Sequence, residues 1–79
     1  MNIKYYESQY DNKRFRIEGP YEDIGAYLFI FENDDVVNKY DYLQDTIQIC
    51  MEFAFEDFNV PLDSWVELPE GTKSCYFDE

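Results

Sequence analysis

One stretch of this 79-residue chain has a clear helical period, and it limits the folds that the chain can adopt. Between residues 41 and 58, apolar residues recur at spacings of three, four and one, which places them on one side of a helix with 3.6 residues per turn. The pattern predicts one long helix, Asp41–Phe58, that supplies much of the core. Its apolar residues are Leu43, Ile47, Cys50, Met51, Ala54 and Phe58.

Both ends of this helix are expected at recognisable signals. Asp41, with Gln44 three residues later, resembles a capping box and predicts a start at residues 40–42. Asn59-Val60-Pro61 predicts the end, because the residue before a proline is disfavoured in a helical conformation.

Short segments around this helix have the pattern of strands. The clearest is Ala26–Glu32, an apolar and aromatic run of strand length that is expected at the centre of a sheet. Residues 2–7 and 13–18 predict two earlier strands, joined by a turn at Asp11-Asn12 and ended by Gly19-Pro20. Residues 64–68 and 73–78 predict one or two later strands.

The predicted fold class is therefore α+β, in a single domain of residues 1–79. A small antiparallel sheet of three to five strands is expected to pack on one long helix, in the order β-β-β-α-β(-β). Arg14 and Arg16 are expected to pair across strands with acids such as Glu32.

A continuous apolar run in the central strand implies that both faces of the sheet are shielded there, yet one helix covers only one face. Either Tyr27, Phe29 and Phe31 or Leu28 and Ile30 must then be covered by loops, by the C-terminal segment or by a second protein. A homodimer through the Tyr27, Phe29 and Phe31 face is one hypothesis.

The charge of the chain excludes two classes of partner. The formal net charge is −12, and no lysine or arginine occurs between Tyr40 and Thr72. Nucleic acid and anionic membranes both carry the wrong sign, so direct binding to either is not expected.

Enzyme chemistry and cofactor binding are not expected either. The chain has no histidine, no Gly-x-Ser-x-Gly motif and no Gly-rich phosphate loop. Residues 32–35 offer oxygen ligands, but they lack the EF-hand spacing, and turn preferences explain their composition, so no metal site is predicted. Cys50 and Cys75 lack metal-ligand spacing and are predicted to be reduced thiols. Without a signal peptide or a membrane-spanning run, a cytoplasmic location is expected, in a bacterial or phage-infected cell.

The outer flank of the predicted helix carries a row of carboxylates. Asp45, Glu52 and Glu56 follow at steps of seven and four residues, and Asp41 continues the row. A solvated face normally has Lys or Arg three or four residues from each acid, and none is present here. Glu56 and Asp57 also occupy the last turn, where the helix dipole disfavours anions by roughly 0.3–1 kcal/mol. Contact with a cationic partner would relieve this repulsion; the alternative is a solvated acidic surface without a function.

A second stripe, Tyr42, Ile49 and Phe53, flanks the acids on the predicted helix. It is either an extension of the core or the apolar part of a binding surface. The predicted partner-binding residues are Asp41, Asp45, Glu52, Glu56, Asp57, Tyr42, Ile49 and Phe53.

Together these observations predict a non-enzymatic acidic protein that binds and inhibits a positively charged protein, such as a nuclease or another nucleic-acid-binding protein, by mimicking nucleic acid. Phage or mobile-element counter-defence proteins of the anti-restriction or anti-CRISPR type work in this way, and the comparison rests on size and charge rather than on a motif. One alternative is an immunity protein that neutralises a cognate bacterial nuclease toxin. A second alternative is a small homo-oligomeric assembly protein.

Overall fold

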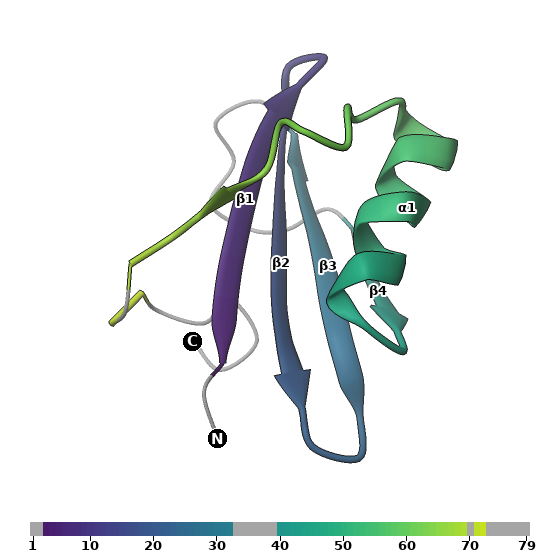
Figure 1. The fold of residues 1–79 in the computed structure, drawn as a ribbon. Helices are drawn as coiled ribbons and strands as arrows, with labels where there is room; N and C mark the ends of the chain where they lie inside the picture. Colours follow the sequence, from purple (N-terminus) through teal and green to yellow (C-terminus); the bar gives the residue numbers. More distant parts are fainter. Residues whose placement is uncertain (1–2, 33–39, 70, 73–79) are drawn as a thin grey trace.

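The computed structural model describes residues 3–32, 40–69 and 71–72, and within these residues the chain forms one antiparallel sheet and one helix (Figure 1). The five strands lie in the order β4-β3-β2-β1-β5, and α1 covers one face of β2, β3 and β4. The predicted α+β class is therefore confirmed, with the element order β-β-β-β-α-β. The elements are β1 (Lys4–Tyr10), β2 (Lys13–Tyr21), β3 (Gly25–Glu32), β4 (Tyr40–Gln44), α1 (Ile47–Phe58) and β5 (Val66–Glu67).

The helix is shorter than predicted, because residues 40–44 form strand β4 rather than the first turns of a helix. β4 pairs antiparallel with β3, with Tyr42 opposite Leu28 and Asp41 opposite Phe29. Paired residues share a face of the sheet, so Tyr42 points toward α1 and Asp41 points to the other side. The segment has both a helical spacing and an alternating pattern. Hydrogen bonds to the edge of β3 favour the alternating pattern, so the segment forms a strand.

Thr46 is the N-cap of α1, so the predicted capping box at Asp41 is wrong. The Thr46 backbone is extended, and its side-chain oxygen accepts a hydrogen bond from the backbone N–H of Ile49 at 3.1 Å. This is ordinary N-cap geometry. The helix therefore has 12 residues, from Ile47 to Phe58.

The predicted end of the helix is confirmed, and Asn59 makes it. Asn59 adopts the left-handed conformation (φ 65°), and its backbone N–H bonds to the carbonyls of Ala54 and Phe55. The N–H of Val60 then donates to the carbonyl of Ala54 at 3.2 Å, and Val60 is buried. This ending, with a left-handed residue at Asn59, turns the chain back toward the sheet.

Turn residues set the β1–β2–β3 meander. Asp11 and Asn12 both have positive φ (56° and 61°), as a two-residue hairpin turn requires, so the predicted turn is confirmed. The prediction that Gly19-Pro20 ends the second strand is wrong: β2 runs on to Tyr21 through a shift of register. This irregular pairing accommodates a proline that has no N–H to donate. Gly19 is needed there, since an added Cβ would lie 2.8 Å from the Cβ of Ala26.

The core lies between the sheet and α1. Leu43 was expected in this core, but it is 52% exposed because it points away from α1 on the edge strand. The fully buried residues come from β2, β3, α1 and the segment after α1. They are Phe15, Ile17, Ala26, Leu28, Ile30, Cys50, Ala54 and Val60.

The face of the sheet away from α1 is also apolar on β3. Phe29 and Phe31 are each only 2% exposed, so the central strand is shielded on both faces, as its sequence predicts. Tyr27 stacks on Phe29 (centroids 5.8 Å apart), and the Arg14 guanidinium lies 4.1 Å from the centroid of the Phe31 ring. Leu43 of β4, opposite Tyr27, remains 52% exposed on this face.

The segment after α1 crosses the sheet to reach β5 beside β1 (Figure 1). β5 covers Val66–Glu67, the middle of the predicted strand at residues 64–68, and the predicted strand at residues 73–78 lies outside the described residues. A bilayer could not be crossed by any helix in the described part of the chain.

Candidate protein-binding surface

The described residues contain no group of side chains arranged to bind a metal ion, and their one described cysteine is buried. Over residues 3–32, 40–69 and 71–72, no three His, Cys, Asp or Glu side chains are placed to hold a metal ion. The Cys50 thiol is buried and lies 3.5 Å from the carbonyl oxygen of Ala26, and burial raises its pKa to about 12. Cys50 is therefore protonated and shielded, which does not suit a nucleophile. Cys75 and most of the acidic 32–35 segment lie outside the described residues.

The cations of the described chain are confined to β1 and β2. Arg14 and Arg16 pair across strands with an acid, as predicted, but the acid is Glu7 rather than the example Glu32: both contact one Glu7 oxygen, at 3.9 and 3.3 Å. Glu7 lies directly opposite Arg16 in the pairing of β1 with β2, which explains why the arginines pair with this acid. The other two pairs are Lys4 with Glu67 at 3.6 Å and Lys13 with Asp11 at 3.7 Å.

The outer face of α1 carries exposed carboxylates. Glu52 and Glu56 lie one turn apart and are exposed, and the Gln48 amide donates a hydrogen bond to Glu52 at 3.2 Å. Asp57 is exposed in the last turn, which has no basic residue. None of the four described cations pairs with these three acids. The helix therefore keeps a negative outer face, and its C-terminal dipole adds to that charge.

The predicted carboxylate row is only partly present. Asp41 lies on β4 and faces away from α1, and Asp45 is exposed just before the N-cap. Both were placed on the helix because its start was predicted too early. Of the four acids in the row, only Glu52 and Glu56 lie on one helix.

The predicted apolar stripe divides in a similar way. Tyr42, on β4, packs on Phe53 with ring centroids 4.8 Å apart and on Phe58 at 6.4 Å. Tyr42 and Phe53 are half-buried extensions of the core. Ile49 is 37% exposed and lies beside the acids on the outer face.

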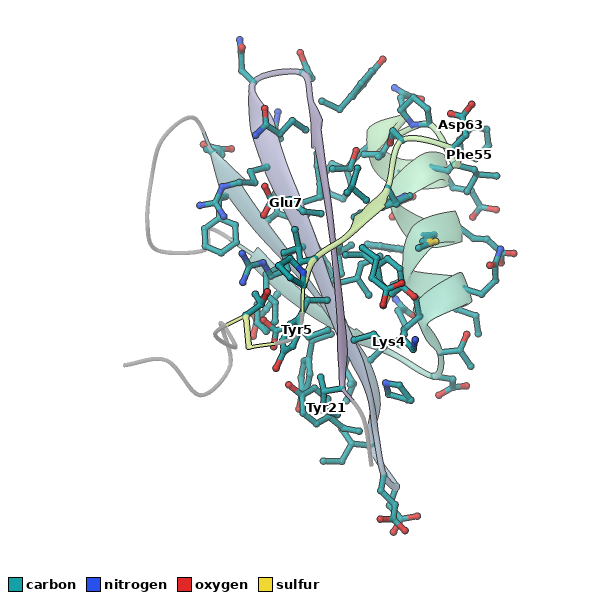
Figure 2. The ribbon with its side chains drawn as sticks, turned by 60° about the vertical axis from the view of Figure 1, so that its left-hand side comes forward. Lys4, Tyr5, Glu7, Tyr21, Phe55 and Asp63 are labelled. Carbon is teal, nitrogen blue, oxygen red and sulfur yellow. The ribbon has the colours of Figure 1, made fainter. Side chains whose placement is uncertain are left out.

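Sequence reasoning missed two apolar residues near the end of α1. Phe55 and Leu62 are each 48% exposed. Figure 2 shows Phe55 and the neighbouring Asp63 at the same end of the helix. The available signal was that Phe55 falls outside the apolar stripe of α1 and next to its acids.

No family model matches the chain, and no curated protein or solved structure matches it. The class that the structure defines is a small α+β domain with an acidic helix on one face of its sheet. Its function must be argued from that surface.

Proposed function

We propose that this is a non-enzymatic acidic protein that inhibits a basic, nucleic-acid-binding protein by occupying the surface that would otherwise hold nucleic acid. One observation carries the proposal: the four described cations are all paired on β1 and β2, and none of them pairs with Glu52, Glu56 or Asp57 of α1.

This arrangement opposes stability in the free protein. Two acids four residues apart repel by about 0.2–0.5 kcal/mol. An anion in the last helical turn costs about 0.3–1 kcal/mol more. A cationic partner would remove both costs on contact, and the same field would speed association.

The spacing of these acids bears on what they imitate. Glu52 to Asp57 spans five residues, or about 7.5 Å of helix axis. Three charges over that length average about 4 Å apart along the axis. One DNA strand has a phosphate about every 3.4 Å and the duplex has one charge about every 1.7 Å. Asp57 lies about 100° around the helix from Glu56, so the likeness to nucleic acid is one of charge density and not of a line of phosphates.

The same surface fits an immunity protein for a nuclease toxin, because that partner also presents a cationic nucleic-acid site. The two readings differ in the identity of the partner rather than in the contact chemistry. A homo-oligomer through the Tyr27, Phe29 and Phe31 face stays an alternative: Phe29 and Phe31 are already buried within one chain, while Leu43 opposite Tyr27 is 52% exposed.

Affinity capture with two charge-reversed variants tests the proposal. The test variant is Glu52→Lys with Glu56→Lys. The control is Glu22→Lys with Asp23→Lys, two exposed acids in the β2–β3 turn. Both variants change the net charge from −12 by four, to −8. We expect the wild type and the control to capture the same basic protein from lysate, and the test variant to lose it.

The captured protein should then bind nucleic acid less well when the wild-type domain is added. Equal capture by both variants would remove α1 from the interface. Undiminished nucleic-acid binding by the captured protein would remove the inhibitory role.

A further inference from the structure

The C-terminal end of α1 combines exposed apolar and acidic side chains. Phe55 and Leu62 are each 48% exposed, and Glu56 and Asp63 are exposed next to them in the sequence. Figure 2 shows Phe55 and Asp63 at the same end of α1. We call these four residues the C-terminal patch. Half-exposed Phe and Leu side chains on a small domain are typical of surfaces that bind another protein when they stand together among charges.

The backbone around the patch is fixed by hydrogen bonds. The Asn59 N–H donates to the Phe55 carbonyl at 3.0 Å, which closes the helix. Both the backbone N–H and the hydroxyl of Ser64 donate to the carbonyl of Pro61, at 3.1 and 2.7 Å, which closes the turn that holds Leu62 and Asp63. The patch is therefore ordered before any partner arrives, which lowers the entropy lost on binding.

Val60 explains why Leu62 stays outside. A helix that ends in this way usually buries one apolar residue just beyond its cap, and Val60 fills that position with no exposed area. The core needs no second apolar side chain from this turn, so Leu62 is left on the surface. Phe55 is left out because it lies on the outer flank of α1, beside Glu52.

The charge of the patch identifies its occupant. Glu56 and Asp63 have no partner among the described cations, and the helix C-terminus adds about half a negative charge. Anionic surfaces are repelled, while a simple polycation gains nothing from Phe55 and Leu62. The complementary ligand is cationic and apolar at once.

We propose that the C-terminal patch docks a cationic amphipathic helix of the partner protein. Its apolar side chains would cover Phe55 and Leu62, and its Lys or Arg side chains would face Glu56 and Asp63. This inference rests on the proposed function, because it names the segment by which a basic partner is held. It adds an apolar anchor to a contact so far argued from charge alone.

Two synthetic peptides test the inference, each of about five helical turns, or roughly 18 residues. One carries leucines on a single face and lysines elsewhere; the other contains lysine only. Affinities are measured by fluorescence anisotropy at about 0.15 M salt, where exposed charges are screened beyond about 8 Å. We expect the wild-type protein to bind the leucine–lysine peptide more tightly than the lysine peptide.

Phe55→Ser and, separately, Leu62→Ser are expected to weaken binding of the leucine–lysine peptide by about tenfold or more and to leave binding of the lysine peptide unchanged. Ile24→Ser is the matched control, because Ile24 is 49% exposed and follows Glu22 and Asp23 in the β2–β3 turn. This control should bind both peptides as the wild type does. Far-UV circular dichroism of each variant checks that the fold is intact.

Equal affinity of the wild type for both peptides would overturn the inference, and so would an Ile24→Ser effect as large as that of Phe55→Ser. The proposed function fails separately. If the captured partner is lost with the Glu52 and Glu56 charge reversal but retained by Phe55→Ser, the apolar anchor is wrong and the charged contact stands. If Phe55→Ser weakens the peptide complex, but the captured protein binds nucleic acid equally well with and without the wild-type domain, docking stands and inhibition is wrong.

Discussion

Replacing Glu56 by lysine is expected to stabilise the folded protein. Glu56 occupies the last turn of α1, one turn after Glu52, and both side chains are exposed. The helix dipole disfavours an anion there by about 0.3–1 kcal/mol and favours a cation by a similar amount. The contact with Glu52 changes from a repulsion of about 0.2–0.5 kcal/mol to an attraction of similar size. The free energy of unfolding should therefore rise by about 1–3 kcal/mol at low salt, toward the lower end for exposed groups.

For a chain of 79 residues, each kcal/mol shifts Tm by about 4–8 °C, so Glu56→Lys should raise Tm by about 5–10 °C. The assay is thermal unfolding followed by far-UV circular dichroism, at about 10 mM and about 1 M salt, where the Debye length falls from about 30 to about 3 Å. Glu22→Lys is the control, because it makes the same change in net charge away from the helix.

Most of the gain should disappear at high salt. A Tm equal to or below that of the wild type, or a gain no larger than that of Glu22→Lys, would show that α1 carries no electrostatic cost. Unpaired acids on α1 would then give no indication of a cationic partner.

Three further predictions concern the core and the end of the helix. Phe15→Ala should lower the free energy of unfolding by about 3–5 kcal/mol in urea titration, because the ring is fully buried and packs on Phe58 at 5.7 Å; a loss below about 2 kcal/mol would contradict this packing. Asn59→Ala should cost about 1 kcal/mol while Asn59→Gly keeps the stability, because φ is positive there; equal effects would contradict the left-handed cap. In a Cys75→Ser background, Cys50 should react with a thiol probe at about pH 8 only as fast as the protein unfolds. Because folding raises the Cys50 pKa from 9.0 to about 12, its contribution to stability should hold below about pH 9 and decline as the pH rises toward 12.

The sequence predicts the meander well, since its signals are local and agree with one another. Phe15 and Ile17 alternate with Arg14 and Arg16, and the turn residues fall where the hairpin needs positive φ. The β4 segment was assigned to the helix because Leu43 lies four residues before Ile47, which imitates a helical stripe. The segment carries both a helical spacing and a short alternating pattern, and the edge of β3, a tertiary contact, decides between them.

The candidate site likewise contains residues that local sequence signals place correctly and residues that they do not. Glu52 and Glu56 lie well inside the helix, so their outward positions survive an error at its start. Asp41 depended on that start and moved to the other face of the sheet. The exposure of Phe55 depends on where the chain runs after Asn59, which helical periodicity does not address.

β4 sits at the edge of the sheet, hydrogen-bonds only to β3 among the described strands, and is followed after two residues by α1. Edge strand and helix thus form one continuous segment, joined also by the packing of Tyr42 on Phe53 and Phe58, so we expect their amides to become protected or exposed together. Amide hydrogens in residues 40–58 should exchange together and sooner than those of the meander. A partner bound to the outer face of α1 would slow exchange in both elements. Slower amide exchange in β4 would then reveal binding at a surface to which β4 does not contribute.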